Sequence, residues 1–337
     1  MKIRAPGKLI LSGEHAVVYG APALAMTVNR YVTATAIQQA MPLISFDFSD
    51  LAYKNGLTLT ALRHLRARIH QQYEHFREGK CRIRDVLKKS HELAQFVFTF
   101  FLEGVKRRRI EGVRIHLQSD IPVGCGMGSS AATILGVSHA LAHFLQMEAS
   151  PEFFLQMGLE AENMQHGHSS GLDLRICLQG GCVLARQGVL QARDISTLPF
   201  YLVNTGLPLT TTGECVSQVA PLFRDAGLIA EFAAVTERFD AAFSRHDFSA
   251  VRDCISENAV LLMRIGVVPK RVQQFIRDIE NFQGGAKICG AGAVMGDRAG
   301  MVLVATDQPD ALMDLSARYQ YSVQPVTGEA RGVHVVQ

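Results

Sequence analysis

The hydrophobic positions follow a strand-like period in some stretches of the chain and a helix-like period in others. Residues 27–37 are rich in β-branched side chains, and residues 113–118 alternate between apolar and polar, which predicts two strands. Between them, apolar residues recur every three or four positions, which predicts an amphipathic helix. That apolar stripe consists of Leu62, Leu65, Ile69, Tyr73 and Phe76. A second helix is predicted over residues 84–109 from its wide apolar face.

The rest of the chain continues as blocks of strands and blocks of helices. A Gly-rich loop at 122–128 precedes a helix predicted over 129–144. Further strands are predicted at 182–185, 199–203, 300–305 and 332–336, and further helices within 213–281 and 309–318. Because the two kinds of element do not alternate regularly, the fold class expected is α+β. The length of 337 residues suggests two domains, and a boundary near 185–198 divides them into residues 1–190 and 191–337.

Composition places the protein among globular chains. Hydrophobic residues make up 48%, charged residues 19%, and the net charge is only +3, which argues against disorder. No run of about 18 apolar residues would span a membrane, and the N-terminus lacks a signal-peptide pattern, so a cytoplasmic location is expected. The seven cysteines contain no C-x-x-C pair and are interpreted as reduced, packed thiols. A zinc site built from His166, His168, Cys177 and Cys182 is the less favoured alternative.

Positive charge is concentrated in one region. Residues 61–114 hold 14 Lys and Arg against 6 Asp and Glu, although the whole chain is nearly neutral. Such a region could bind nucleic acid, or it could be a solvated helix face that also attracts anionic ligands. The second interpretation is favoured because no nucleic-acid-binding motif is present, and no nucleic-acid partner is expected.

The strongest chemical signal is the run P-V-G-C-G-M-G-S-S-A-A at residues 122–132, between a predicted strand and a predicted helix. Alternate glycines let a backbone approach an anion closely, and the start of a helix favours phosphate. The run matches neither the Walker pattern nor the dinucleotide G-x-G-x-x-G. An ordinary turn is the alternative, but the context favours phosphate binding. The residues expected to take part are Pro122, Gly124, Gly126, Gly128, Ser129 and Ser130.

Two further motifs contain candidate chemistry. In A-P-G-K-L-I-L-S-G-E-H-A-V-V-Y-G-A-P-A-L at residues 5–24, Lys8 follows turn-forming residues, and Glu14 and His15 stand among apolar neighbours. Polar groups in such surroundings are either paired locally or used on a ligand. The Gly-rich run at 287–296 suggests a loop that packs on a ligand, although a plain turn explains it equally well.

Two carboxylates flank a Gly/Ser loop between these motifs. Glu162 is expected on a helix, and Asp173 follows the loop. One carboxylate near Mg²⁺ and a second near an acceptor hydroxyl is an arrangement that phosphoryl transfer uses. Their spacing in the sequence does not establish that they converge.

Taken in order, the motifs at 5–24, 122–132, 160–173 and 287–292 resemble those of the GHMP kinases, the superfamily of galactokinase, homoserine kinase, mevalonate kinase and phosphomevalonate kinase. The first motif is most similar to the mevalonate kinase branch. The resemblance implies an N-terminal domain like domain 2 of ribosomal protein S5 and a C-terminal ferredoxin-like domain. It implies that ATP, Mg²⁺ and a small-molecule substrate such as mevalonate bind between the two domains. A homodimer is also possible from the resemblance, and no membrane partner is expected.

The resemblance also implies roles for individual residues. Asp173 resembles the catalytic base, and Lys8 the lysine that pairs with it. Ser130 and Glu162 resemble the Mg²⁺ ligands, and the loop at 122–130 resembles the triphosphate cradle. The substrate-side residues implied are Glu14, His15, Thr211, Gly290 and Ala291.

The sequence departs from the family pattern in two places. The third motif has Ala293, Val294 and Met295 where mevalonate kinases carry glycines. In the acid loop, Ser169 and Leu174 stand where the pattern P-S-G-x-D-N has proline and asparagine. Two alternatives to mevalonate kinase activity therefore stay open. One is a related kinase acting on another alcohol or a phosphorylated acid, such as phosphomevalonate, and the other is a non-catalytic, ligand-binding regulator.

Overall fold

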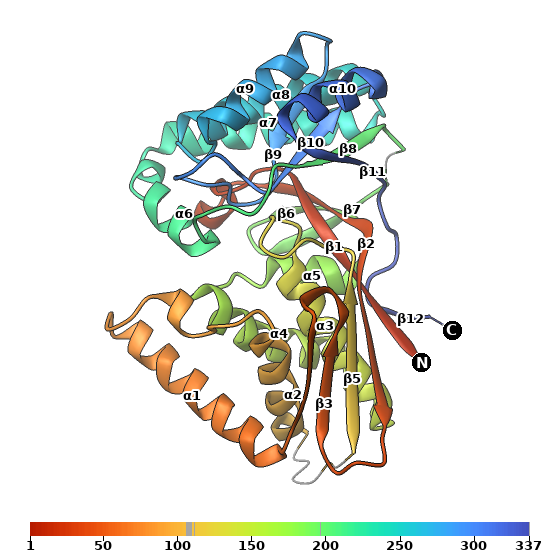
Figure 1. The fold of residues 1–337 in the computed structure, drawn as a ribbon. Helices are drawn as coiled ribbons and strands as arrows, with labels where there is room; N and C mark the ends of the chain where they lie inside the picture. The colour runs from red at the N-terminus through yellow and green to blue at the C-terminus, as the bar shows by residue number, and fades with distance from the viewer. Residues whose placement is uncertain (106–109, 111, 196, 337) are drawn as a thin grey trace.

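The computed structural model describes residues 1–105, 110, 112–195 and 197–336 (Figure 1). Its larger sheet has the strand order β12-β1-β2-β5-β3-β4, and β6 and β7 extend from β2. The strands are β1 (Lys2–Ser12), β2 (Ala23–Gln38), β3 (Ile44–Phe48), β4 (Tyr53–Leu57), β5 (Val113–Ser119), β6 (Cys182–Arg186), β7 (Val189–Arg193) and β12 (His334–Val336). Only β3 and β5 pair in parallel among these strands, and the other pairs are antiparallel.

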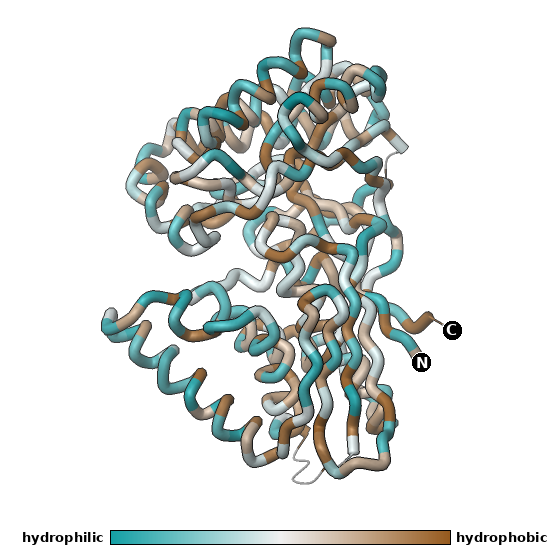
Figure 2. Tube along the Cα trace, viewed as in Figure 1, coloured by the Kyte–Doolittle hydropathy of each residue, from teal (hydrophilic) through white to brown (hydrophobic). Residues whose placement is uncertain are grey.

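Helices α1 to α5 accompany the larger sheet (Figure 1). They are α1 (Leu59–Arg77), α2 (Glu92–Gly104), α3 (Ser129–Phe144), α4 (Pro151–His166) and α5 (Leu172–Gln179). The central helix α3 packs on β1 and β2 and also contacts α2, α4 and α5. By contrast, α1 fully buries only Leu62 and Ile69, and its trace is mostly hydrophilic in Figure 2.

A smaller antiparallel sheet has the order β11-β8-β10-β9. Its strands are β8 (Phe200–Asn204), β9 (Gly285–Ile288), β10 (Met301–Ala305) and β11 (Ser322–Val326). The accompanying helices are α6 (Thr212–Val219), α7 (Ala226–Ser244), α8 (Phe248–Arg264), α9 (Lys270–Glu280) and α10 (Pro309–Tyr319). Single-turn 3₁₀ helices occur at η1 (Ala16–Tyr19), η2 (Ser49–Leu51), η3 (Ile83–Asp85) and η4 (Leu222–Arg224). The expected α+β class is confirmed.

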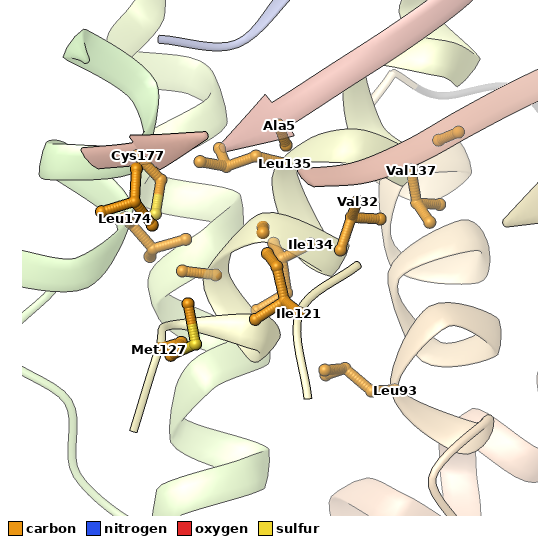
Figure 3. Packing of buried hydrophobic residues seen from close by; sticks show 14 of the residues in the cluster. Ala5, Val32, Leu93, Ile121, Met127, Ile134, Leu135, Val137, Leu174 and Cys177 are labelled. Atoms are coloured by element: carbon orange, nitrogen blue, oxygen red, sulfur yellow. The ribbon is translucent and has the colours of Figure 1, made fainter. Parts of the chain in front are cut away.

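The core beneath the Gly-rich loop joins several elements (Figure 3). Ala5 and Val32 of the sheet pack over Leu135 and its neighbours on α3, and Leu174 and Cys177 of α5 belong to the same cluster. Met127, within the Gly-rich loop, is also buried there. The loop and α5 are therefore supported by one continuous apolar layer.

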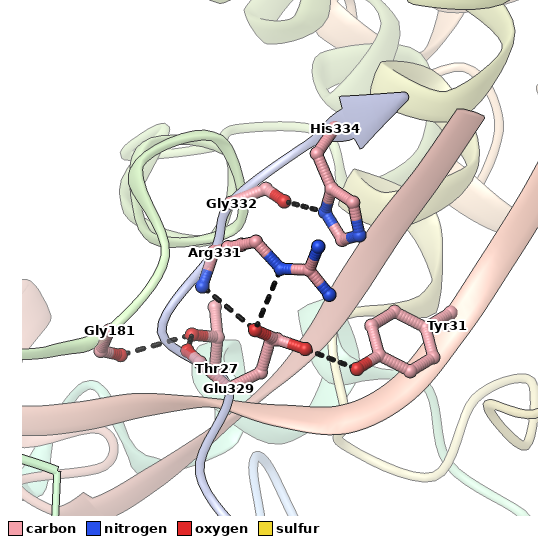
Figure 4. Close-up of polar contacts among 7 residues, drawn as sticks. All are labelled: Thr27, Tyr31, Gly181, Glu329, Arg331, Gly332 and His334. Atoms are coloured by element: carbon pink, nitrogen blue, oxygen red, sulfur yellow. Dashed lines mark hydrogen bonds and ion pairs between the residues drawn. The ribbon is translucent and has the colours of Figure 1, made fainter. Parts of the chain in front are cut away.

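The segment after β11 returns to the larger sheet (Figure 4). Thr27 Oγ1 donates to the carbonyl oxygens of Gly181 and Glu329, and Tyr31 donates its hydroxyl proton to the Glu329 carboxylate. Beyond this point β12 pairs with β1, with Lys2 opposite Val336. The division at residues 190 and 191 stays a prediction, but the last strand lies in the larger sheet, apart from the other C-terminal strands.

The observed elements correct the second predicted helix. In place of one helix over 84–109, residues 83–85 form a 3₁₀ turn and α2 begins only at Glu92, whose carboxylate accepts a hydrogen bond from the Lys88 backbone N–H. Residues 106–109 lie outside the described residues. The six cysteines other than Cys81 are buried, and all seven are free, as expected. In the part of the chain that is described, no helix combines the length and apolarity needed to cross a membrane.

Candidate active site

A cleft of about 1780 Å³ brings together segments from both sheets. It is lined by the Gly-rich loop, the beginning of the chain, the acid loop and the third motif. Every site residue predicted from the sequence except Thr211 lines it. The four motifs, which are far apart in the sequence, therefore do converge.

Lys8 and Asp173 form an ion pair in this cleft, with Lys8 Nζ 3.0 Å from Asp173 Oδ2. A break in the β1–β2 register between Pro6 and Gly7 precedes Lys8, and such irregularities re-aim side chains. Burial lowers the pKa of Lys8, but the attraction of Asp173 outweighs this, and the net pKa is raised. Asp173 stands in the first turn of α5 and is one-third exposed (33%). Asp173, the candidate base, therefore lies between the Lys8 ammonium group and the open cleft.

The Gly-rich loop approaches its neighbours most closely at its glycines, which lack side chains. Gly126 has a φ of +86°, and a Cβ there would lie 2.3 Å from the Cys289 carbonyl oxygen. Gly128, also left-handed, is the N-cap of α3, and no side chain caps this helix. The first N–H groups of α3 therefore point into the cleft without a side-chain acceptor, as an anion site requires.

Glu162 and Ser130 fit a divalent cation. The Glu162 carboxylate is buried, and both residues line the cleft. Burial, together with repulsion from Asp173, raises the pKa of Glu162 to about 7, so a cation nearby would relieve an existing excess of negative charge. Magnesium is commonly held by one or two carboxylates plus substrate phosphates, which matches this sparse donor set. Among the described residues no cluster of three or more His, Cys, Asp or Glu could hold a metal, which rules out the zinc alternative there.

Glu14 is paired with a lysine that sequence reasoning missed. Lys287 is fully buried on β9, forms an ion pair with Glu14, and donates to the Ile10 carbonyl oxygen at 3.0 Å. Burial raises the pKa of Glu14 even though Lys287 opposes the shift. The second carboxylate oxygen, Oε2, has no hydrogen-bond partner among the described residues. Glu14 therefore offers one free acceptor at the lining of the cleft.

His15 offers a second acceptor. Its Nε2 donates to the Ala291 carbonyl oxygen at 3.1 Å, and its Nδ1 lacks a partner among the described residues. Burial lowers the pKa of His15 to about 4, so the ring is neutral at pH 7 and Nδ1 carries a lone pair. His15 also has a φ of +61°, an uncommon conformation for a non-glycine residue. Two consecutive residues of the first motif, Glu14 and His15, therefore each have an acceptor atom without a hydrogen-bond partner among the described residues.

The structure places Thr211 differently from the expectation. Thr211 is exposed and caps α6, where its hydroxyl accepts from the Glu214 N–H at 3.3 Å. The neighbouring Thr210 is the residue that lines the cleft, and its Oγ1 accepts from the Val294 N–H at 3.3 Å. The one-residue difference follows from the start of α6, because an N-cap side chain must turn toward its own helix.

Four cations from the basic region also line the cleft. They are Arg82, Arg84, Lys88 and Lys89, on η3 and in the loop that follows it. Part of the positive charge between residues 61 and 114 therefore faces the site.

Comparison with known proteins agrees with this geometry. Residues 92–181 match the GHMP kinases N terminal domain. The mevalonate kinase of Pyrococcus furiosus is 28% identical over 304 residues, covering 86% of this chain and 85% of that protein. The mevalonate kinase of Archaeoglobus fulgidus is 28% identical over 290 residues, covering 86% and 88%. A crystal structure of the Methanococcus jannaschii mevalonate kinase superposes with a TM-score of 0.82 at 21% identity, covering 97% of this chain and 98% of that one.

The fold and the converging motifs define an ATP-dependent kinase of small molecules. Over residues 92–181 the chain matches a domain of the GHMP kinases, and its curated relatives of moderate identity are mevalonate kinases.

Proposed function

We propose that this kinase transfers the γ-phosphoryl group of ATP to the primary hydroxyl of mevalonate, giving 5-phosphomevalonate and ADP. The observation that carries the proposal is the Lys8–Asp173 ion pair in the same cleft as the free acceptors of Glu14 and His15. The similarity to curated mevalonate kinases over 86% of the chain supports the choice of acceptor.

Asp173 is the proposed catalytic base. Its carboxylate accepts the proton of the acceptor hydroxyl as that oxygen bonds to the γ-phosphorus and the bond from phosphorus to ADP breaks. Lys8 holds the carboxylate in place through the ion pair. Little covalent chemistry is asked of the protein, because phosphoryl transfer depends mainly on positioning and charge.

The remaining roles concern ATP and the acceptor. The N–H groups at the start of α3 bind the phosphates, with Gly124, Gly126 and Gly128 allowing close approach. Ser130 and Glu162 are the residues that would hold Mg²⁺, which neutralises charge on the transferring phosphates when bound. Glu14 Oε2 and His15 Nδ1 accept hydrogen bonds from acceptor hydroxyls, and Gly290 and Ala291 form the adjoining wall.

The test is ADP release by the purified protein with Mg-ATP and one acceptor at a time. Mevalonate, 5-phosphomevalonate, homoserine and galactose form the panel, and the Asp173→Asn protein is the control for contaminating kinases. Saturable turnover with mevalonate and not with the other three is expected. Turnover with only one of the other acceptors would show that mevalonate is not the substrate, but the protein would still be a small-molecule kinase.

One observation favours a second candidate, a kinase of a phosphorylated acid such as phosphomevalonate. Arg82, Arg84, Lys88 and Lys89 line the cleft and offer contacts to a second anionic group on such a substrate. A kcat/KM at least tenfold higher for 5-phosphomevalonate than for mevalonate would select this candidate. Cytoplasmic location, a role in isoprenoid synthesis and a homodimer stay predictions.

A further inference from the structure

Both proposed metal-binding side chains have a hydrogen-bonding partner at the end of α4 or in the loop between α4 and α5. Ser169 donates its hydroxyl proton to Glu162 Oε2 at 2.5 Å, and His166 Nε2 lies 3.2 Å from Ser130 Oγ. Neither His166 nor Ser169 has been given a role so far, and both line the cleft.

Ser169 is fixed from three directions. Its Oγ donates to Glu162 and accepts from the Gly171 N–H at 3.0 Å, and its own N–H donates to Asn163 Oδ1 at 2.8 Å. Gly171 is the N-cap of α5, the helix that carries Asp173. One hydroxyl therefore connects the metal-side carboxylate to the helix of the base. Proline, the residue of the family pattern at this position, has neither the hydroxyl nor the N–H and would lose all three bonds.

His166 acts on the other donor. A hydroxyl that offers a lone pair to a cation still has its proton to donate, and Nε2 at 3.2 Å can accept it. That hydrogen bond turns the Ser130 oxygen lone pairs away from His166 and toward the cleft. Outer hydrogen bonds of this kind fix the orientation of metal ligands in proteins.

We propose that Ser169 and His166 are positioning residues that orient Glu162 and Ser130 toward the cation. The proposal rests on the metal role of Glu162 and Ser130 under the proposed function, and it does not depend on which acceptor is phosphorylated.

Cation affinity tests Ser169 directly. Mn²⁺ binding to the full chain is measured by electron paramagnetic resonance with a non-hydrolysable ATP analogue and no acceptor. Ser169→Ala weakens Mn²⁺ binding by roughly 10- to 100-fold, as loss of such partners typically does. Ser169→Thr retains the hydroxyl and stays within about threefold of the original protein. Ser170→Ala is the matched control, because Ser170 Oγ accepts from the Leu172 N–H at the start of α5 and makes no hydrogen bond to Glu162 among the described residues.

His166 provides an independent test that leaves the Glu162 contacts untouched. His166→Leu removes the acceptor and weakens Mn²⁺ binding, while His166→Gln retains an acceptor oxygen and recovers at least part of it. Melting temperatures of all variants identify any that fail to fold. Unchanged Mn²⁺ affinity in folded Ser169→Ala and His166→Leu would overturn the proposal, as would an equal loss in Ser170→Ala. Absence of Mn²⁺ binding by the unaltered protein would overturn the metal role itself. Failure of the acceptor panel alone would leave these results standing.

Discussion

Lys8 Nζ lies 3.0 Å from Asp173 Oδ2, which joins the first strand of the larger sheet to the first turn of α5. The two residues are far apart in sequence, and the pair forms because β1 and α5 pack against the same core. The Lys8 ammonium group is buried, whereas the Asp173 carboxylate is partly exposed and lines the cleft.

Asp173→Asn should therefore abolish most turnover while retaining nucleotide binding. Removing a general base costs about 10²–10⁴ in kcat. Steady-state ADP release gives kcat, and calorimetry gives the affinity for ATP. Asp310→Asn, an exposed change of the same type in the first turn of α10, is the control. Near-normal kcat in Asp173→Asn would contradict the assignment of the base.

The buried Glu14–Lys287 pair should show strong energetic coupling. Replacing one partner leaves the other charge buried and unpaired, which costs about 3–5 kcal/mol of unfolding free energy. Glu14→Leu combined with Lys287→Met should cost less than the sum of the two single changes, because no unpaired charge is left. Urea unfolding of the four proteins measures this coupling, and additive losses would show that the pair is not energetically connected.

His15 and His139 should each lower stability as pH falls from about 6.5 to 4, against the opposite contribution of Glu162, whose pKa is raised to about 7. Burial lowers the pKa of His15 and of His139 to about 4, below the ordinary 6.5 of the unfolded chain. In that window the two histidines bind protons in the unfolded state but not in the folded state, so their contribution to the free energy of unfolding decreases as pH falls. Each histidine contributes roughly 3 kcal/mol across the window.

One variant tests whether His139 contributes to the pH dependence of the unfolding free energy. His139→Phe preserves the stack on Phe154, whose ring centroid is 3.7 Å away, and should flatten the pH dependence measured by urea unfolding. His64→Phe, on an exposed position of α1, should leave the slope unchanged. An identical slope in His139→Phe would contradict the buried, neutral state of this ring.

Gly126→Ala should damage the phosphate loop beyond the ordinary cost of a positive φ. Gly79 has a comparable φ of +73° with no atom within 4 Å of a built Cβ, whereas the Gly126 Cβ would meet Cys289 O at 2.3 Å. Gly79→Ala therefore reports the cost of φ alone, about 1 kcal/mol. Gly126→Ala should lose about 1–3 kcal/mol more and raise the KM for ATP. Equal losses in the two variants would show that the loop can move away.

Local signals in the sequence predicted most elements correctly, and long-range packing explains the exceptions. The helix over 129–144 was predicted to the residue, because a Gly-rich loop marks its start. The helix predicted over 84–109 was wrong at its beginning. Val86 is apolar because it is buried under a turn, where it does not belong to a helical face.

In the candidate site too, local signals in the sequence predicted some residues, and long-range packing explains those that were missed. The motifs named Lys8, Glu14, Glu162 and Asp173 from residue types and order, and the structure places them in one cleft. The partner of Glu14 could not be predicted, since Lys287 reaches it only where β9 meets the end of β1. Thr210 was missed for a local reason, because the boundary of α6 decides which of two adjacent threonines faces the cleft.

The return of β12 to β1 affects the order in which the protein can assemble. The strand that carries Lys8 is synthesised hundreds of residues before the strand that pairs with its outer edge. During translation this edge exposes unpaired backbone groups, which are a template for pairing with other chains. A ribosome-bound chain can thus form the Gly-rich loop and α3 early, but the edge of β1 at residues 2–4 is paired only after β12 has emerged.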